Sequence, residues 1–189
     1  MEPARKIRLR IGSSVLRKRM ERLTRKVSYS RIDNVKKIGI IWDASEVSDF
    51  ASLSGFYQKM SEKSIDVKIL GYFPGKDLPD QYTAIRYLSF IRREEVSFLY
   101  LPVSPESESF IKSRFDILID INFKNLLPLK YITSMSDAAL KVGLYEPEKD
   151  GHAFDLMIEM KRPVNVDEYL NQVWHYLEMI RAEQVEKVH

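Results

Sequence analysis

Several residue types that carry chemistry are absent or scarce in this 189-residue chain. It has no cysteine, which excludes disulfides, thiolate catalysis and zinc sites built on sulfur. Its histidines, at positions 152, 175 and 189, do not show the HExxH spacing of a metalloprotease. The sequence therefore predicts no metal site, and the lack of cysteine fits a reducing compartment such as the cytoplasm.

Glycine-rich phosphate loops are absent as well. Neither GxGxxG nor the Walker pattern occurs, so we expect no nucleotide cofactor bound in the usual manner, and we predict no other cofactor. No serine stands in a nucleophile-elbow context, which leaves a hydrolase triad unsupported. No run of 18 apolar residues occurs, so we expect no transmembrane segment.

What the chain does contain is a strong charge asymmetry. Residues 1–32 hold 11 Lys or Arg against Glu2 and Glu21, a net charge of +9. The remainder holds 19 basic against 25 acidic residues, a net charge of −6. We therefore divide the chain into a basic arm with its linker, residues 1–34, and a single α/β domain, residues 35–189.

The arm predicts an amphipathic basic helix. Gly12-Ser13-Ser14 is a helix-start signal, and Leu16, Met20, Leu23 and Val27 then recur at helical spacing, which indicates a helix over residues 14–29. Clustered basic side chains neutralise phosphates and release counterions, so the arm is a candidate site for RNA or another anion. The candidate residues are Arg5, Lys6, Arg8, Arg10, Arg17, Lys18, Arg19, Arg22, Arg25 and Lys26.

The body is organised around residues 115–123. In this apolar run Ile117, Ile119 and Ile121 project to one side of a strand, and Asp120 projects to the other. A helix is expected over residues 125–135 and a strand over 141–145, which completes a βαβ unit.

Other patterns add further elements. We expect strands at 37–43, 67–73 and 96–101, and an edge strand at 154–160 where apolar and polar residues alternate. We expect helices opening at Ser45, Ser104 and Asn165, and another over 79–93. The fold class predicted is α/β, a Rossmann-like, doubly wound, mostly parallel sheet of about six strands with an antiparallel edge strand, plus the N-terminal basic amphipathic helix.

Ligands of doubly wound sheets bind beyond the carboxyl ends of the strands, which defines a candidate cleft. Asp43 and Asp120 form a carboxylate pair for acid–base chemistry or magnesium if their strands are adjacent. Near Asn122, Lys124 and Asn125 the chain is basic and neutral, so an anionic ligand fits best there. The alternative is structural, with Asn125 capping a helix and Lys124 in solvent.

The order of the elements carries a resemblance. With Lys37-Ile38-Gly39-Ile40-Ile41 first, Phe115-Asp116-Ile117-Leu118-Ile119-Asp120 next and Lys141-Val142-Gly143 last, the chain resembles an uncharacterised family of Bacteroidota proteins, a domain of unknown function. The resemblance implies a bacterial cytoplasmic protein and carries no known activity. A local likeness over residues 114–145 is to the Rossmann-like half of heptosyltransferase-type glycosyltransferases, which need two such domains.

Two functions follow as hypotheses. The first is a non-enzymatic cytoplasmic protein that binds RNA or a ribonucleoprotein through the basic arm. The second is a small enzyme or ligand sensor that takes a phosphate or sugar ligand in the cleft. Alternatives for the arm itself are packing on the acidic body, a protein partner or homodimer, and an anionic membrane surface, for which the arm lacks Trp and Phe anchors.

Overall fold

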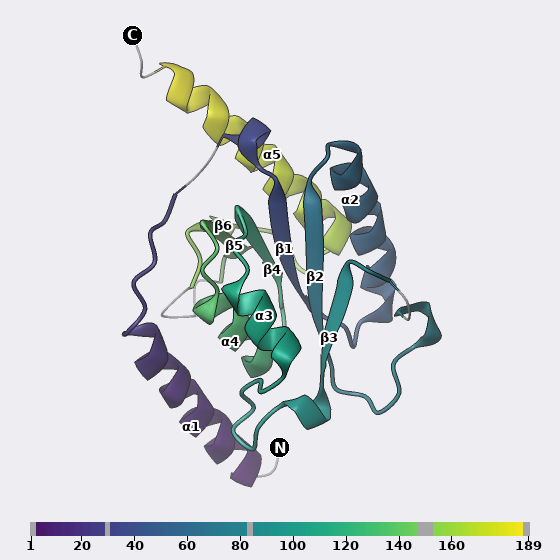
Figure 1. The fold of residues 1–189 in the computed structure, drawn as a ribbon, viewed down its shortest axis with the longest axis vertical. Coiled ribbons are helices and arrows are strands. Elements are labelled where there is room, and N and C mark those ends of the chain that lie inside the picture. Colours follow the sequence, from purple (N-terminus) through teal and green to yellow (C-terminus); the bar gives the residue numbers. More distant parts are fainter. Residues whose placement is uncertain (1–2, 29–30, 83–84, 147–152, 187–189) are drawn as a thin grey trace.

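A six-stranded sheet forms the centre of the protein (Figure 1). The computed structural model describes residues 3–28, 31–82, 85–146 and 153–186. Every strand pairs in parallel with its neighbours, in the order β3-β2-β1-β4-β5-β6. The strands are β1 (Lys37–Asp43), β2 (Asp66–Phe73), β3 (Leu88–Arg92), β4 (Ile117–Ile121), β5 (Leu140–Leu144) and β6 (Leu156–Ile158).

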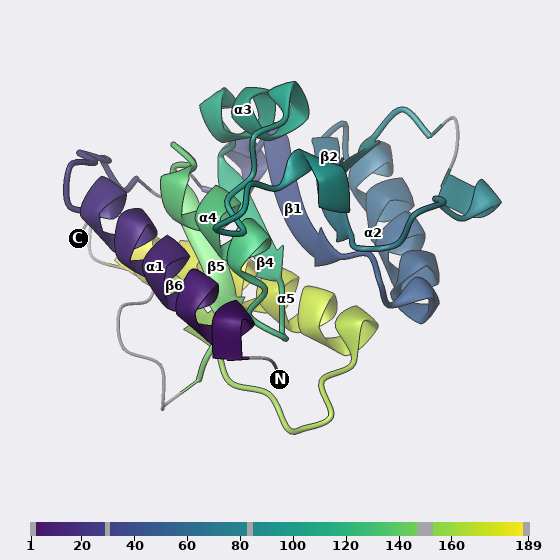
Figure 2. The same ribbon diagram turned by 90° about the horizontal axis from the view of Figure 1, so that it is seen from below.

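Helices cover both faces of the sheet (Figure 2). They are α1 (Pro3–Met20), α2 (Phe50–Glu62), α3 (Pro105–Lys112), α4 (Leu127–Met135) and α5 (Val166–Glu186). The buried residues of α2 and α5 share one apolar cluster, and those of α1, α3 and α4 share the other. The predicted doubly wound α/β fold is therefore confirmed, and none of the described helices is long and apolar enough to cross a bilayer.

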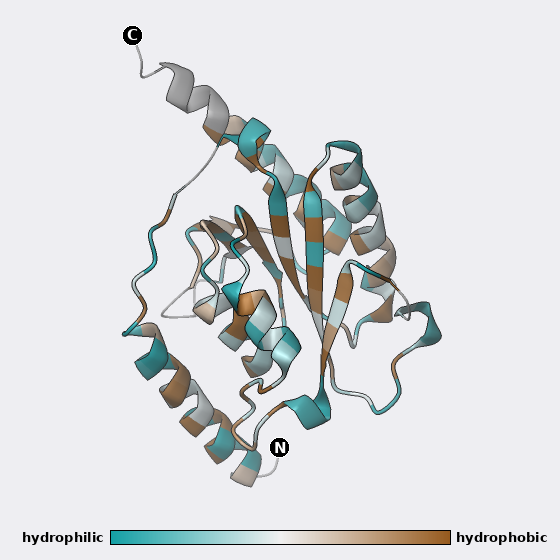
Figure 3. Cartoon of the chain, in the orientation of Figure 1, coloured by the Kyte–Doolittle hydropathy of each residue, from teal (hydrophilic) through white to brown (hydrophobic). Residues whose placement is uncertain are grey.

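The apolar runs become strands that are buried on both faces. All five residues of β4 are buried, and β1 lies between β2 and β4. Ile40 and Ile119, which are paired in register, project into the cluster under α2 and α5, whereas Ile41 and Leu118 project into the cluster under α1, α3 and α4. Figure 3 shows hydrophobic residues along the central strands. Such runs are typical of parallel sheets.

Two predicted helix starts are confirmed by their caps. The Ser104 hydroxyl oxygen accepts a hydrogen bond from the Ser107 backbone N–H at 3.2 Å, with Pro105 in the first turn of α3. The Asn165 side-chain oxygen accepts one from the Glu168 backbone N–H at 3.0 Å, where α5 begins. The third signal, Ser45, does not cap α2, because its hydroxyl donates to Asp43 instead.

The helix predicted over residues 79–93 is wrong, because this segment contains β3. Leu88 and Ile91 lie three residues apart, which is helical spacing, but Leu88 packs in one cluster and Ile91 in the other. Residues three apart on a strand point to opposite faces, so a strand buried on both faces imitates this spacing.

The strand predicted over residues 96–101 is also wrong. This segment is a turn in which the Ser97 N–H donates to the Leu101 carbonyl at 2.8 Å and the Tyr100 N–H donates to the Ser97 carbonyl at 2.9 Å. Tyr100 has a φ of 62°, in the left-handed region. Leu99, Tyr100 and Leu101 are apolar because they pack in the cluster that contains Leu16 of α1, and not because they join the sheet.

The edge strand is parallel, not antiparallel as predicted. β6 pairs with β5 through Val142 and Leu156, Gly143 and Met157, and Leu144 and Ile158, all in parallel register. Alternation of apolar and polar residues identifies a strand with one wet face, and it carries no information on the direction of that strand.

The arm helix begins and ends earlier than predicted. α1 spans Pro3–Met20 and not residues 14–29, and Gly12 lies buried inside it. A Cβ atom at Gly12 would overlap the Leu99 carbonyl oxygen and would lie 2.9 Å from Leu127 Cδ2. The glycine therefore permits close approach of α1 to the body, and it does not mark a helix start.

Candidate functional site

The sheet order places the ends of β1 and β4 side by side at its switch point, where doubly wound proteins bind ligands. Asp43 ends β1 and is 4% exposed, and Asp120, near the end of β4, is 6% exposed. β1 and β4 are adjacent, so the condition set for a carboxylate pair is met. The partners of these two carboxylates decide what the pair can do.

The Asp120 carboxylate holds the following turn and helix in place. Its Oδ1 accepts the Asn122 backbone N–H at 2.7 Å, and its Oδ2 accepts the hydroxyl of Thr133 on α4. The Tyr169 hydroxyl of α5 donates to the Asp120 backbone carbonyl at 3.4 Å. These contacts give Asp120 a structural role that links β4 to helices on both faces of the sheet.

Asn122 closes the turn that leads into α4. Its side-chain oxygen accepts the Leu126 N–H at 2.8 Å, and its side-chain nitrogen donates to the Leu126 carbonyl at 3.0 Å. Asn125 occupies the left-handed region with a φ of 54°, and Leu126, not Asn125, is the N-cap residue of α4. Both asparagines therefore have local conformational roles, and Asn125 does not cap the helix.

Lys124 bridges the switch point to the acidic turn after β1. Its Nζ lies 3.4 Å from Asp43 Oδ2 and forms a closer ion pair with Glu46. The hydrogen bond to Glu46 is the largest cause of the raised pKa of Lys124. The other oxygen of Asp43 accepts the Ser45 hydroxyl at 2.6 Å.

The electrostatics of this cluster disfavour an anionic ligand. Burial raises the pKa of the Asp49 carboxyl, and the charges of Glu46 and Asp43 raise it further. Three carboxylates therefore surround one ammonium group, and that ammonium group is already paired. A phosphate placed here would have to displace two carboxylates from Lys124.

The structure places most of the arm cations in solvent. Eight of the ten candidate side chains are exposed, and Arg8 and Arg25 are half-buried. The exposed ones are Arg5, Lys6, Arg10, Arg17, Lys18, Arg19, Arg22 and Lys26. Arg22, Arg25 and Lys26 follow α1 in an irregular segment and do not lie on the helix as predicted.

Two sets of contacts fix the arm to the body. Along α1, Arg8 near the start lies over the Phe98 ring, 4.7 Å from its centroid, Leu16 is 2% exposed, and Arg19 near the end donates to the Tyr131 hydroxyl. After α1, Arg25 forms a 2.5 Å ion pair with Asp155 and donates to the Ala138 carbonyl at 2.8 Å. Within the described part of the chain, this is the one ion pair between the arm and a body carboxylate. The arm is thus docked on the body, and most of its cations form no ion pair with a described carboxylate of the body.

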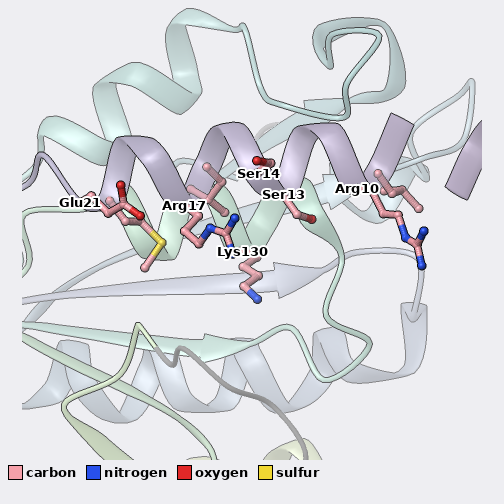
Figure 4. A pocket seen from close by; sticks show the side chains of 9 residues that line it. Arg10, Ser13, Ser14, Arg17, Glu21 and Lys130 are labelled. Carbon is pink, nitrogen blue, oxygen red and sulfur yellow. The ribbon is translucent and has the colours of Figure 1, made fainter. Parts of the chain in front are cut away.

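A groove runs between α1 and α4 (Figure 4). It has a volume of about 610 Å³, and Leu9, Leu16 and Met20 contribute apolar side chains to it. Arg10 and Arg17 of α1, Glu21 just after it and Lys130 of α4 also line the groove. The basic surface of α1 therefore continues onto the body through Lys130.

Sequence reasoning missed two residues that shape this surface and one buried lysine. Phe98 is 73% exposed beside Arg8, and Lys130 extends the basic surface, but neither stands in a charge run or motif. Lys141 is 3% exposed, and its Nζ donates to the Ser134 carbonyl at 3.0 Å, at the C-terminal end of α4. Burial, followed by the charge of Arg25, lowers the pKa of Lys141 to about 8. The one signal for Lys141 in the sequence was a lysine at the first position of a predicted strand, between Leu140 and Val142.

The sheet order and the two helical layers define a doubly wound, Rossmann-like α/β protein without a glycine-rich phosphate loop. A family model described as "Family of unknown function (DUF6913)" matches residues 9–180, and the chain belongs to this family. The matched region begins inside α1, so most of the basic helix is part of the family's domain. No curated protein matches the sequence.

Proposed function

We propose that this protein binds RNA, free or within a ribonucleoprotein, on the outer surface of α1 and of the segment that follows it, and that it catalyses no reaction. We further place it in the cytoplasm, which the absence of cysteine fits. The competing hypothesis, an enzyme or sensor with an anionic ligand at the switch point, is disfavoured by the pairing of Lys124 with Glu46 and Asp43.

One observation carries the proposal: α1 is fixed on its inner side and strongly basic on its outer side. Gly12 and Leu16 are buried against the body, whereas Lys6, Arg10 and Arg17 are exposed along the helix. A docked helix holds these cations in place before any ligand arrives, so binding costs less conformational entropy than it would for a disordered arm. A helix of 18 residues is about 27 Å long, enough to reach several phosphates.

The placement of charge along α1 supports an anionic partner. The positive end of a helix dipole favours acidic residues in the first turn, and α1 has none there. Arg5 and Lys6 occupy this end instead. A basic first turn lowers the stability of an isolated helix, and a bound phosphate backbone removes that cost.

The test is a binding assay with two variants of equal charge. In the arm variant, four exposed cations of α1 become Gln: Lys6, Arg10, Arg17 and Lys18. In the control variant, four exposed cations outside the arm become Gln: Lys59, Lys68, Lys76 and Arg86. Affinity for a labelled structured RNA and for a single-stranded RNA is measured by fluorescence anisotropy. We expect the arm variant to lose at least about tenfold in affinity and the control variant to lose less, because phosphates are held by the cations that face them.

Equal losses in both variants would show that net charge, and not the surface of α1, attracts RNA. The alternative roles of the arm have their own signature. If α1 instead holds a homodimer, light scattering gives twice the monomer mass for the wild type and the monomer mass for the arm variant. The wild type then has no RNA affinity at physiological salt. Either result would remove the proposal.

A further inference from the structure

The loop between β3 and α3 carries an exposed aromatic side chain on a rigid turn. The turn runs from Ser97 to Leu101 and is closed by the two backbone hydrogen bonds described above, and the Ser97 hydroxyl accepts the Leu101 N–H at 3.1 Å. Phe98 projects from this turn and is 73% exposed, the largest exposed fraction among the large hydrophobic side chains that the structure describes. A ligand that covers this ring in the functional state would gain hydrophobic free energy.

Helix α1 fixes the position of this turn. The Leu99 carbonyl oxygen lies against Gly12, so close that no side chain fits between them. Arg8 covers part of the Phe98 ring, with its guanidinium carbon 4.7 Å from the ring centroid, and lies 5.4 Å from the centroid of Tyr100. Because Arg8 covers one face of the ring, the exposed area of Phe98 is on the part of the ring that points away from Arg8.

The surroundings of Phe98 are basic on the side of α1. Burial raises the pKa of the Tyr72 hydroxyl, and the nearby charges of Arg93 and Arg5 oppose that increase. Interactions with Tyr100 and Asp43 also raise the pKa of Tyr72, so all of these groups lie near the carboxyl end of β2. Glu95, an acid of the same loop, accepts a hydrogen bond from the Arg92 backbone N–H at 2.7 Å and caps the turn there.

We propose that Phe98 is a stacking platform for an unpaired base, and that the RNA bound by this protein is single-stranded where it crosses the start of α1. This inference rests on the proposed function and adds the form of the RNA. A rigid aromatic ring beside a row of cations is the arrangement that binds single strands, because bases stack on the ring while the cations hold the backbone. In a duplex the bases are already stacked in pairs and do not reach such a ring.

The charge around the ring decides between RNA and a protein partner. A hydrophobic pocket of a protein would take Phe98 with apolar residues around it, but Arg8 of α1 lies against the ring, and Arg5 and Arg93 lie near Tyr72. A polyanion complements these cations, and the cation–π contact with Arg8 takes up one face of the ring, so that a base would stack on the other face.

The experiment compares Phe98→Ala, Phe98→Trp and Val103→Ala in the full-length protein. Val103 is the matched control, because it is 60% exposed on the same loop and has no ring. The probes are a fluorescein-labelled single-stranded RNA of about 12 nucleotides without self-complementarity, and the same strand annealed to its complement. Thermal unfolding of each variant shows that the fold is retained.

We expect Phe98→Ala to weaken single-strand binding roughly 5- to 150-fold, which corresponds to about 1–3 kcal/mol for one stacked base. Duplex affinity and the slope of log affinity against log salt stay unchanged, because that slope counts phosphate contacts and not stacked bases. Phe98→Trp retains affinity, and its added indole fluorescence is quenched by the single strand beyond any change in the wild type. Val103→Ala binds as the wild type does.

Three results would overturn the inference, and they separate it from the function on which it rests. If Phe98→Ala binds the single strand within about twofold of the wild type, while loss of the α1 cations abolishes binding, the stacking role fails and RNA binding stands. If Phe98→Ala weakens duplex and single strand equally, the loop acts through the placement of α1. If the wild type binds neither RNA at low salt, both proposals fail.

Discussion

The docking of α1 predicts an unusual sign for a glycine substitution. In an exposed helix position, Gly→Ala raises stability by about 1 kcal/mol, because alanine has the higher helix propensity. At Gly12 the added Cβ atom would overlap the Leu99 carbonyl oxygen, and a backbone atom cannot rotate away as a side chain does. Such overpacking costs about 1–3 kcal/mol. We therefore expect Gly12→Ala to be neutral to destabilising by up to about 2 kcal/mol.

Gly55→Ala is the matched control. Gly55 lies in α2, is exposed, and has no heavy atom within 4 Å of the position of an added Cβ atom. We expect this variant to gain about 0.5–1 kcal/mol. Because helix propensity enters both substitutions, the difference between the two variants isolates the cost of the overlap at Gly12, about 1–3 kcal/mol.

Urea unfolding followed by circular dichroism measures both free energies, and the thermal midpoints are expected to differ by about 2–4 °C per kcal/mol. If Gly12→Ala stabilises the protein as much as Gly55→Ala does, α1 does not pack on the loop in solution. The rigid presentation of its cations would then be refuted.

Three further predictions concern Leu16 of α1, the buried Lys141 and the Asp120 carboxylate. Leu16→Ala should destabilise the protein by about 2–5 kcal/mol in urea unfolding, because the side chain is 2% exposed between α1 and the body; a cost under about 1 kcal/mol would contradict the docking. Burial lowers the pKa of Lys141 to about 8 from 10.5, so the folded state binds fewer protons between these values and stability should rise as pH increases through this window. Lys141→Met should remove that rise, and a wild type with flat stability there would contradict the assignment. Thr133→Val should destabilise by about 1–3 kcal/mol, because it removes a donor to the buried Asp120 carboxylate; an unchanged urea midpoint would contradict the structural role of Asp120.

The fold was predictable where a segment's own pattern determines its structure. The runs at β1, β2, β4 and β5 are apolar on both faces, which is typical of parallel strands, and Ser104 and Asn165 lie at the caps that their side chains form. These features depend on neighbouring residues in the chain, so they can be read without knowledge of the rest of the molecule.

The errors arose where distant residues determine the structure. β3 imitates helical spacing because Leu88 and Ile91 are buried in opposite layers, and this requires helices on both faces. The direction of β6 is defined by its pairing with β5, which its own alternation of residues does not indicate. The role of Gly12 depends on Leu99, which is far from it in sequence.

The same distinction applies to the candidate site. The cations of the arm were evident from composition, but their exposure depends on which side of α1 packs on the body. Lys124 was correctly placed next to the switch point, yet its pairing with Glu46 is a contact across 78 residues that no local pattern indicates. Phe98 had no signal, since a lone Phe in an apolar segment normally indicates a buried strand.

The salt dependence of RNA affinity tests the central claim most directly. If about four to six cations of the arm contact phosphates, log affinity for single-stranded RNA falls against log salt with a slope of about −3 to −4. The variant in which Lys6, Arg10, Arg17 and Lys18 become Gln should have a slope closer to zero by about 2–3, while the control variant keeps the slope of the wild type. A wild-type slope near zero, or identical slopes for both variants, would contradict the assignment of RNA binding to α1.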